Sequence, residues 1–162
     1  MPPLISQEDH RLTLRPLAIV FASLMLAACS MGGGGGALSP GLSARMDQPG
    51  AELNRTEALG IVNHFRTATG AQPLVADASL DAAAQALVVQ YIQTGSPPRQ
   101  PDGTILRTSA GYPTFAETFS GWRATPADAS AMADKSARRA GLASRYDANS
   151  AYGVYWVLLL AP

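Results

Sequence analysis

Few side chains of this 162-residue chain could carry acid–base or nucleophilic chemistry. The chain has two histidines, His10 and His64, and a single cysteine, Cys29. Two carboxylates, Glu117 and Asp128, lie in the second half of the sequence. A hydrolase would need a histidine base together with such acids. However, no nucleophile motif accompanies His64, and no spacing rule pairs the two carboxylates. The residue types therefore permit catalysis without specifying it.

Cys29 follows a segment that has the features of an export signal. Two arginines precede a short apolar run over residues 16–28, and small residues end it. This pattern predicts a secretory signal peptide over residues 1–28, because the run is shorter than the roughly 20 residues of a membrane-spanning helix. The sequence Leu-Ala-Ala-Cys at residues 26–29 resembles the bacterial lipobox, whose cysteine is acylated and becomes the new N-terminus. The alternative is an ordinary cleaved signal with an incidental cysteine.

Cleavage before Cys29 leaves 134 residues with balanced charge. The full chain has 12 basic and 12 acidic residues, and two of each lie in residues 1–28, so ten of each remain. This balance gives no reason to expect a nucleic-acid partner. Residues 29–50 are rich in Gly, Ser and Pro and predict a flexible tether. We expect one small domain over residues 51–162, attached to a membrane by acyl chains on Cys29.

The last apolar segment predicts a layered fold. In residues 151–160, AYGVYWVLLL, both alternating sets of side chains are mostly apolar, so a strand here must be covered on both faces. Apolar stripes predict helices over about residues 54–69 and 80–93, with shorter ones over 113–122 and after Thr125. A further strand is predicted over residues 139–146. The pattern as a whole predicts an α+β domain.

The ordered segments resemble the CAP superfamily (cysteine-rich secretory, antigen and pathogenesis-related proteins, also called SCP-like), especially its small bacterial envelope members. Residues 61–74, IVNHFRTATGAQPL, resemble the family string V-N-x-x-R-x-x-x-G-x-x-P-L. Residues 80–85, LDAAAQ, resemble the start of its second helix. The segments SAGY, FAETFSGW, TP, RAGLA and NSAYGVYW follow in order from residue 109. The resemblance covers roughly residues 52–162 and implies an α-β-α sandwich with a small antiparallel sheet.

The resemblance also implies a cleft in which two histidines and two acidic residues can hold a divalent metal. The bacterial pattern W-x-x-S-P-x-H-R falls on residues 122–129, which places Asp128 at the position of the histidine. The family's glutamate falls near Leu106, the second acidic position falls on Thr125, and residues 96–107 contain no histidine. Because zinc normally needs three or four converging ligands, we expect a degenerate metal site and no metal cofactor.

Four residues remain candidates for this cleft: Asp128, Thr125, Glu117 and His64. Each also has a structural interpretation. Asp128 is an acid in the first turn of a helix, where the helix dipole favours it. Glu117 could pair with Arg123 or lie on a solvated helix face, and His64 borders an apolar stripe.

From these residues we expect no catalytic site. We expect an exported, membrane-anchored binding module of the bacterial cell envelope, whose ligand is a lipid, an envelope component or a protein. Two alternatives stay open. One is a hydrolase that uses Asp128, Glu117 and His64, and the other is a purely structural envelope protein.

Overall fold

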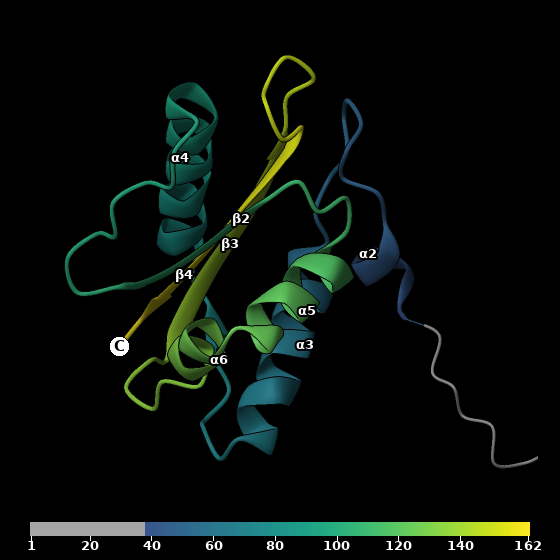
Figure 1. The fold of residues 1–162 in the computed structure, drawn as a ribbon. Coiled ribbons are helices and arrows are strands. Elements are labelled where there is room, and N and C mark those ends of the chain that lie inside the picture. The colour runs from purple at the N-terminus through teal and green to yellow at the C-terminus, as the bar shows by residue number, and fades with distance from the viewer. Residues whose placement is uncertain (1–37) are drawn as a thin grey trace, which may run out of the picture. The chain divides into compact units, whose positions relative to one another are not determined.

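The computed structural model describes residues 38–162 (Figure 1). The predicted signal peptide, Cys29 and the first part of the predicted tether lie outside the described residues. None of the helices in residues 38–162 is long and apolar enough to span a bilayer. The elements follow in the order α2 (Pro40–Ser43), α3 (Arg55–Ala68), β1 (Val75–Ala76), α4 (Ala78–Thr94), β2 (Ile105–Ala110), α5 (Phe115–Ala124), α6 (Pro126–Met132), β3 (Arg139–Tyr146) and β4 (Val154–Ala161).

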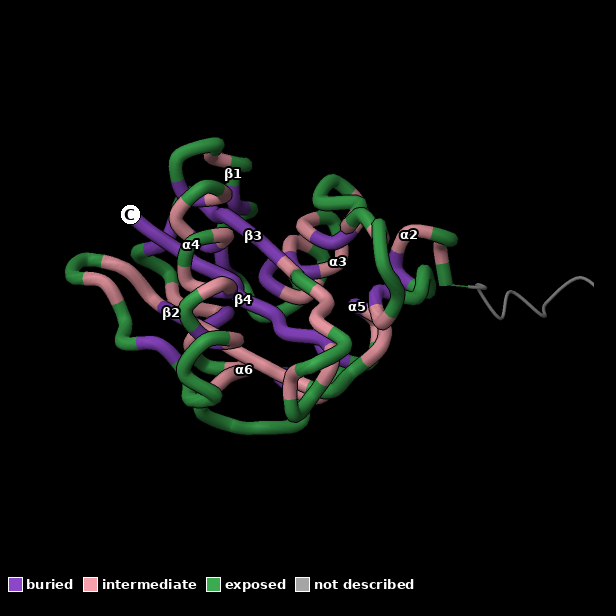
Figure 2. Tube along the Cα trace, turned by 90° about the horizontal axis from the view of Figure 1, so that it is seen from above, coloured by how far each residue is buried: buried purple, intermediate pink, exposed green. Residues whose placement is uncertain are grey.

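The strands form one sheet in the order β1-β3-β4-β2. The predicted last strand, β4, lies inside the sheet and pairs antiparallel with β3 on one side and with β2 on the other. All eight of its residues are buried (Figure 2). At one edge, β1 pairs parallel with β3 through only two residues. The prediction that the final strand is covered on both faces is confirmed.

Helices cover both faces of the sheet. On one face, Trp156, Leu158 and Leu160 of β4 pack in a core with residues of α2, α3, α5 and α6. On the other face, Tyr155 and Val157 pack against α4. Figure 1 shows α4 on one side of the strands and α3 and α5 on the other. The predicted α-β-α sandwich is therefore confirmed.

Two local features set the position of α4 against the sheet. Asp77 caps the helix, since its side chain accepts hydrogen bonds from the main-chain N–H groups of Ser79 and Leu80. Gly141 of β3 lies directly under the first turn. A Cβ atom at Gly141 would come within 2.1 Å of the carbonyl carbon of Leu80, so only glycine allows the helix to approach the strand this closely.

Residues 38–50 differ from the sequence prediction, because the structure includes them in the domain. Leu42 and Met46 are buried in the core with α3 and α5. The carboxylate of Glu57 on α3 also accepts a hydrogen bond of 2.9 Å from the main-chain N–H of Gly41. Two apolar side chains and one carboxylate thus hold a segment whose composition indicates a flexible tether. Within the described residues, core packing therefore extends N-terminal to residue 51, as far as Leu42.

Candidate functional site

The carboxylate of Asp128 is engaged by a cation of the same domain. Asp128 lies in the first turn of α6, and its Oδ1 is 2.7 Å from Nη1 of Arg107 on β2. The two side chains are 28% and 20% exposed, respectively. Leu106, which aligns with the family's glutamate, is buried on the opposite face of the sheet with the α4 residues. Near the predicted cleft, therefore, Asp128 is charge-compensated by a guanidinium.

Thr125 and Glu117 are engaged at helix ends. Glu117 belongs to the capping box of α5: its Oε2 accepts hydrogen bonds from the N–H (3.1 Å) and the hydroxyl (2.8 Å) of Thr114. Thr125 is the N-cap residue of α6, and its hydroxyl donates to the carbonyl oxygen of Gly121 at 3.2 Å. Both side chains thus have structural partners at the start or end of a helix.

His64 is exposed on α3, on the same side of the sheet as α5 and α6. Sharing a side does not bring the candidates together. Within residues 38–162, no three His, Cys, Asp or Glu side chains form a group that could hold a metal ion. His64, Glu117 and Asp128 therefore do not converge on one point.

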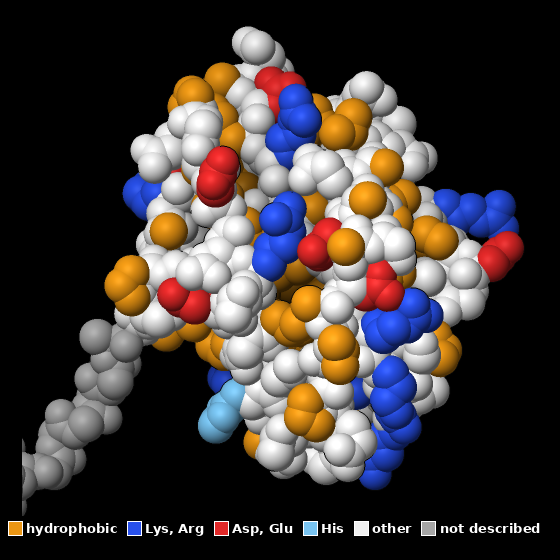
Figure 3. All heavy atoms as spheres, turned by 180° about the vertical axis from the view of Figure 1, so that it is seen from behind, with side chains coloured by type: hydrophobic (Ala, Val, Ile, Leu, Met, Phe, Trp, Pro, Cys, Tyr) orange, Lys and Arg blue, Asp and Glu red, His pale blue; other side chains and the backbone are white. Residues whose placement is uncertain are grey.

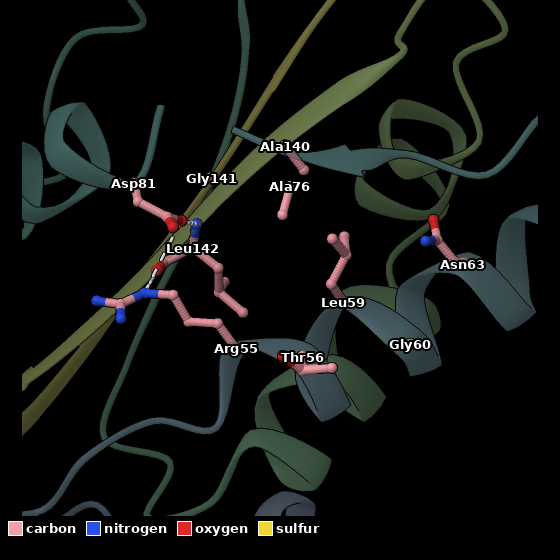
Figure 4. A pocket seen from close by; sticks show the side chains of 10 residues that line it. All are labelled: Arg55, Thr56, Leu59, Gly60, Asn63, Ala76, Asp81, Ala140, Gly141 and Leu142. Atoms are coloured by element: carbon pink, nitrogen blue, oxygen red, sulfur yellow. Dashed lines mark hydrogen bonds and ion pairs between the residues drawn. The ribbon is translucent and has the colours of Figure 1, made fainter. Parts of the chain in front are cut away.

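A different concavity lies between α3 and the sheet edge formed by β1 and β3 (Figure 4). We call it the α3 groove. Its volume is about 420 Å³. The face of the molecule in Figure 3 is hollowed near its centre, where hydrophobic side chains are seen between basic and acidic ones. The groove is lined by Arg55, Thr56, Leu59, Gly60, Asn63, Ala76, Asp81, Ala140, Gly141 and Leu142.

Small residues create the space in the α3 groove. Leu142, Ala140 and Ala76 line it from the sheet, and Leu59 lines it from α3 (Figure 4). Gly60 lies on the next position of the helix, and a Cβ atom there would meet no atom within 4 Å. The lining is thus mostly apolar, and the helix side of the groove is open.

Polar side chains fix one end of the α3 groove. Nε of Arg55 donates to the carbonyl oxygen of Leu142 at 2.8 Å. Oδ1 of Asp81 accepts from the main-chain N–H of Leu142, also at 2.8 Å. The two side chains face each other across this residue, with 3.8 Å between Nε and Oδ1 (Figure 4). Both main-chain groups of Leu142 at the sheet edge are therefore bonded to side chains rather than to a strand.

The opposite end is fixed by Asn63, which belongs to the family string. Its carboxamide accepts from the N–H of Leu74 at 2.7 Å and donates to the carbonyl oxygen of the same residue at 2.9 Å. This pair of bonds draws the extended segment before β1 against α3. The asparagine of the string therefore has a structural role, which the sequence comparison alone does not reveal.

Arg66, the arginine of the same string, is fully buried. Burial lowers the pKa of its guanidinium, and the charge of Asp134 acts in the opposite direction. Among residues 38–162, no carboxylate bonds to it directly. Instead, four hydrogen bonds of 2.6–3.0 Å join the guanidinium to the carbonyl oxygens of Gln72, Met132, Asp134 and Ala137. Arg66 thus ties the turn after α3 to the loop between α6 and β3.

Comparison with known protein families identifies the family of this chain. The sequence matches the CAP family, described as the cysteine-rich secretory protein family, over residues 59–160. The chain therefore belongs to the CAP family. No curated protein gives a significant match to the sequence.

Solved structures agree on the fold. An outer surface protein from Borrelia burgdorferi has a TM-score of 0.55 at 11% identity, over 65% of this chain and 90% of that chain. A cysteine-rich secretory protein from Staphylococcus aureus has a TM-score of 0.51 at 12% identity, over 65% of this chain but only 37% of its own. At these identities the similarity shows the fold alone.

Proposed function

We propose that this CAP-family protein is an exported, lipid-anchored module of the bacterial cell envelope, which binds its ligand in the α3 groove without catalysis. The observation that carries this proposal is the contrast between two regions. The candidate acids are engaged in an ion pair and a capping box, whereas the α3 groove offers about 420 Å³ of mostly apolar space. Apolar concavities with a few fixed polar groups are typical of ligand sites.

The residues at the family's metal positions do not fit a metal ion. Asp128 is the single carboxylate there, and it is paired with Arg107 at 2.7 Å. Leu106 points to the other face of the sheet, and the Thr125 hydroxyl donates to a main-chain carbonyl. Since zinc needs three or four converging ligands, we propose that the metal site has degenerated. Elemental analysis of the purified protein should give well under one zinc per chain, and one tightly bound zinc would contradict this.

The proposed location rests on Cys29 and on the family. The family is described as secretory, and one structural neighbour is a bacterial outer surface protein. With acylation at Cys29, the protein would be anchored in the envelope through its acyl chains. Cys29→Ala should therefore shift the protein out of the membrane fraction, whereas Ser30→Ala should not. Unchanged fractionation of the Cys29→Ala protein would contradict lipid anchoring.

The binding role can be tested by filling the α3 groove. Gly60→Leu places a side chain in open space, and Gly60→Ala is the matched control, because both variants remove a helix glycine. The wild-type protein and both variants would be sedimented with envelopes isolated from the native host. We expect at least tenfold weaker association for Gly60→Leu and a change within twofold for Gly60→Ala. Equal association of all three proteins would rule out the α3 groove.

A further inference from the structure

We propose that the α3 groove and the adjoining edge of β3 form a strand-addition site, where an extended peptide segment of a partner protein pairs with β3. This inference rests on the binding role proposed above and specifies the ligand of the same site. It follows from the juxtaposition of an unpaired strand edge with an apolar groove beside it. In such sites main-chain hydrogen bonds supply affinity, and pockets for alternate side chains supply specificity.

Within residues 38–162, β3 has no neighbouring strand along most of its outer edge, although its residues 140–143 are buried. β3 has eight residues, Arg139–Tyr146, but β1 pairs only with Arg139 and Ala140. After Ala76 the chain turns away into α4. In the described part of the chain, no strand therefore covers the outer side of residues 141–146.

The main-chain groups along this edge point outward at every second residue. Those of Leu142 face away from β4, since Asp81 and Arg55 bond to them. In an antiparallel pair the outward direction recurs at alternate positions, so Ser144 and Tyr146 present their N–H and C=O groups to the same side. Outside the pairing of β3 with β4, no main-chain group within residues 38–162 bonds to these groups of Ser144. This edge offers the donors and acceptors that a peptide main chain needs.

The side chains of Asp81 and Arg55 bond to the main chain of Leu142 where a neighbouring strand would otherwise bond. The Asp81 carboxylate accepts from its N–H, and the Arg55 guanidinium donates to its C=O, as a neighbouring main chain would. The charges are complementary to the peptide unit. The side chains are 48% and 29% exposed for Arg55 and Asp81, and an ion pair so exposed adds little stability. A peptide can therefore displace the pair at little cost.

The α3 groove would receive side chains of the added strand. Side chains alternate between the two faces of a strand, so every second one would point toward α3. There it would meet Leu59, Leu142 and the open space at Gly60 (Figure 4). The partner segment is thus extended, with aliphatic residues at alternate positions.

The test uses full-length protein in phospholipid nanodiscs and two fluorescent peptides. The probe is an acetylated hexapeptide of alternating threonine and leucine. The control is the same peptide with N-methyl groups on alternate residues, which block the hydrogen bonds of one edge. We expect N-methylation to weaken binding at least tenfold. We also expect Gly60→Leu to weaken binding of the unmodified peptide at least tenfold, with Gly60→Ala within twofold of wild type. If Gly60→Leu does not fold, Thr56→Leu serves as the groove-filling variant, because Thr56 lines the same groove one helix turn away.

Each contrary outcome has a distinct meaning. Equal binding of both peptides, or no binding of either, would overturn strand addition. Binding of the unmodified peptide that neither groove-filling variant weakens would place the peptide elsewhere and also overturn it. The binding role itself would fail separately, if Gly60→Leu left the association with isolated envelopes unchanged.

Discussion

Arg66 provides the sharpest test of how this fold is held together. The substitution Arg66→Met keeps a long side chain in the core but removes all four hydrogen bonds of the guanidinium. Two of these bonds, to the carbonyl oxygens of Met132 and Ala137, are fully buried. Water cannot easily replace the lost donor there, so the two carbonyl groups should carry most of the cost.

The magnitude follows from these two groups. A buried acceptor that loses its partner costs about 1–3 kcal/mol, so two of them cost roughly 4 kcal/mol. Removing a guanidinium that is dehydrated in the folded state offsets part of this cost. We therefore expect Arg66→Met to lower the free energy of unfolding by about 3 kcal/mol.

Urea unfolding, followed by tryptophan fluorescence, measures this change. For a domain of this size the slope with urea is roughly 1.5 kcal/mol per molar, so the midpoint should fall by about 2 M. Arg145→Met is the control, because Arg145 is exposed and surface substitutions change stability by about 0.5 kcal/mol or less. If Arg66→Met unfolds at the same urea concentration as the control, or at a higher one, the bonding of Arg66 does not stabilise the domain.

Other positions give further predictions. Trp156 is fully buried, so Trp156→Ala should cost about 3–5 kcal/mol in the same assay, and a loss below about 1 kcal/mol would be inconsistent with a core position. Gly141→Ala should cost at least about 2 kcal/mol through overpacking, because the added Cβ would lie 2.1 Å from main-chain carbon of Leu80; unchanged thermal unfolding would contradict this close approach. Hydrogen bonds from Ser79, Leu80 and other groups lower the pKa of Asp77 to about 2. The contribution of the Asp77 carboxylate to stability is therefore complete at pH values above its pKa in the unfolded chain, about 3.9, and is lost as the pH falls toward 2. The difference in urea midpoint between wild type and Asp77→Asn should shrink between pH 5 and pH 2, and a constant difference would argue against this role.

Strong local signals explain what the sequence predicted correctly. The strand over residues 139–146 and the helix over about 54–69 agree with β3 and α3 (Arg55–Ala68), since apolar periodicity and capping residues mark them. β2 was not predicted. It is an edge strand with mostly half-buried side chains, so it lacks the alternation by which strands are recognised.

Tertiary contacts explain what the sequence could not show. Residues 38–50 have the composition of a linker, yet Leu42 and Met46 are buried by distant helices. The bonding partners of Arg66 include carbonyl groups that follow it by 66–71 positions in the chain, and no local pattern marks such partners. The α3 groove exists largely because Gly60 and the alanines have small side chains or none. Its lining comes from segments that are far apart in the sequence. The sequence comparison indicated Asp128 as a candidate for the cleft, but no sequence pattern predicted its ion pair with Arg107.

We propose that this CAP domain binds its ligand in the α3 groove rather than at the family's cleft. The most direct measurement is a map of main-chain amide shifts by NMR, recorded while an extract of the native envelope is added to the labelled protein. We expect the amide signals of Thr56, Gly60 and Gly141, which line the groove, to shift. Shifts confined to Arg107 and Asp128 would contradict it.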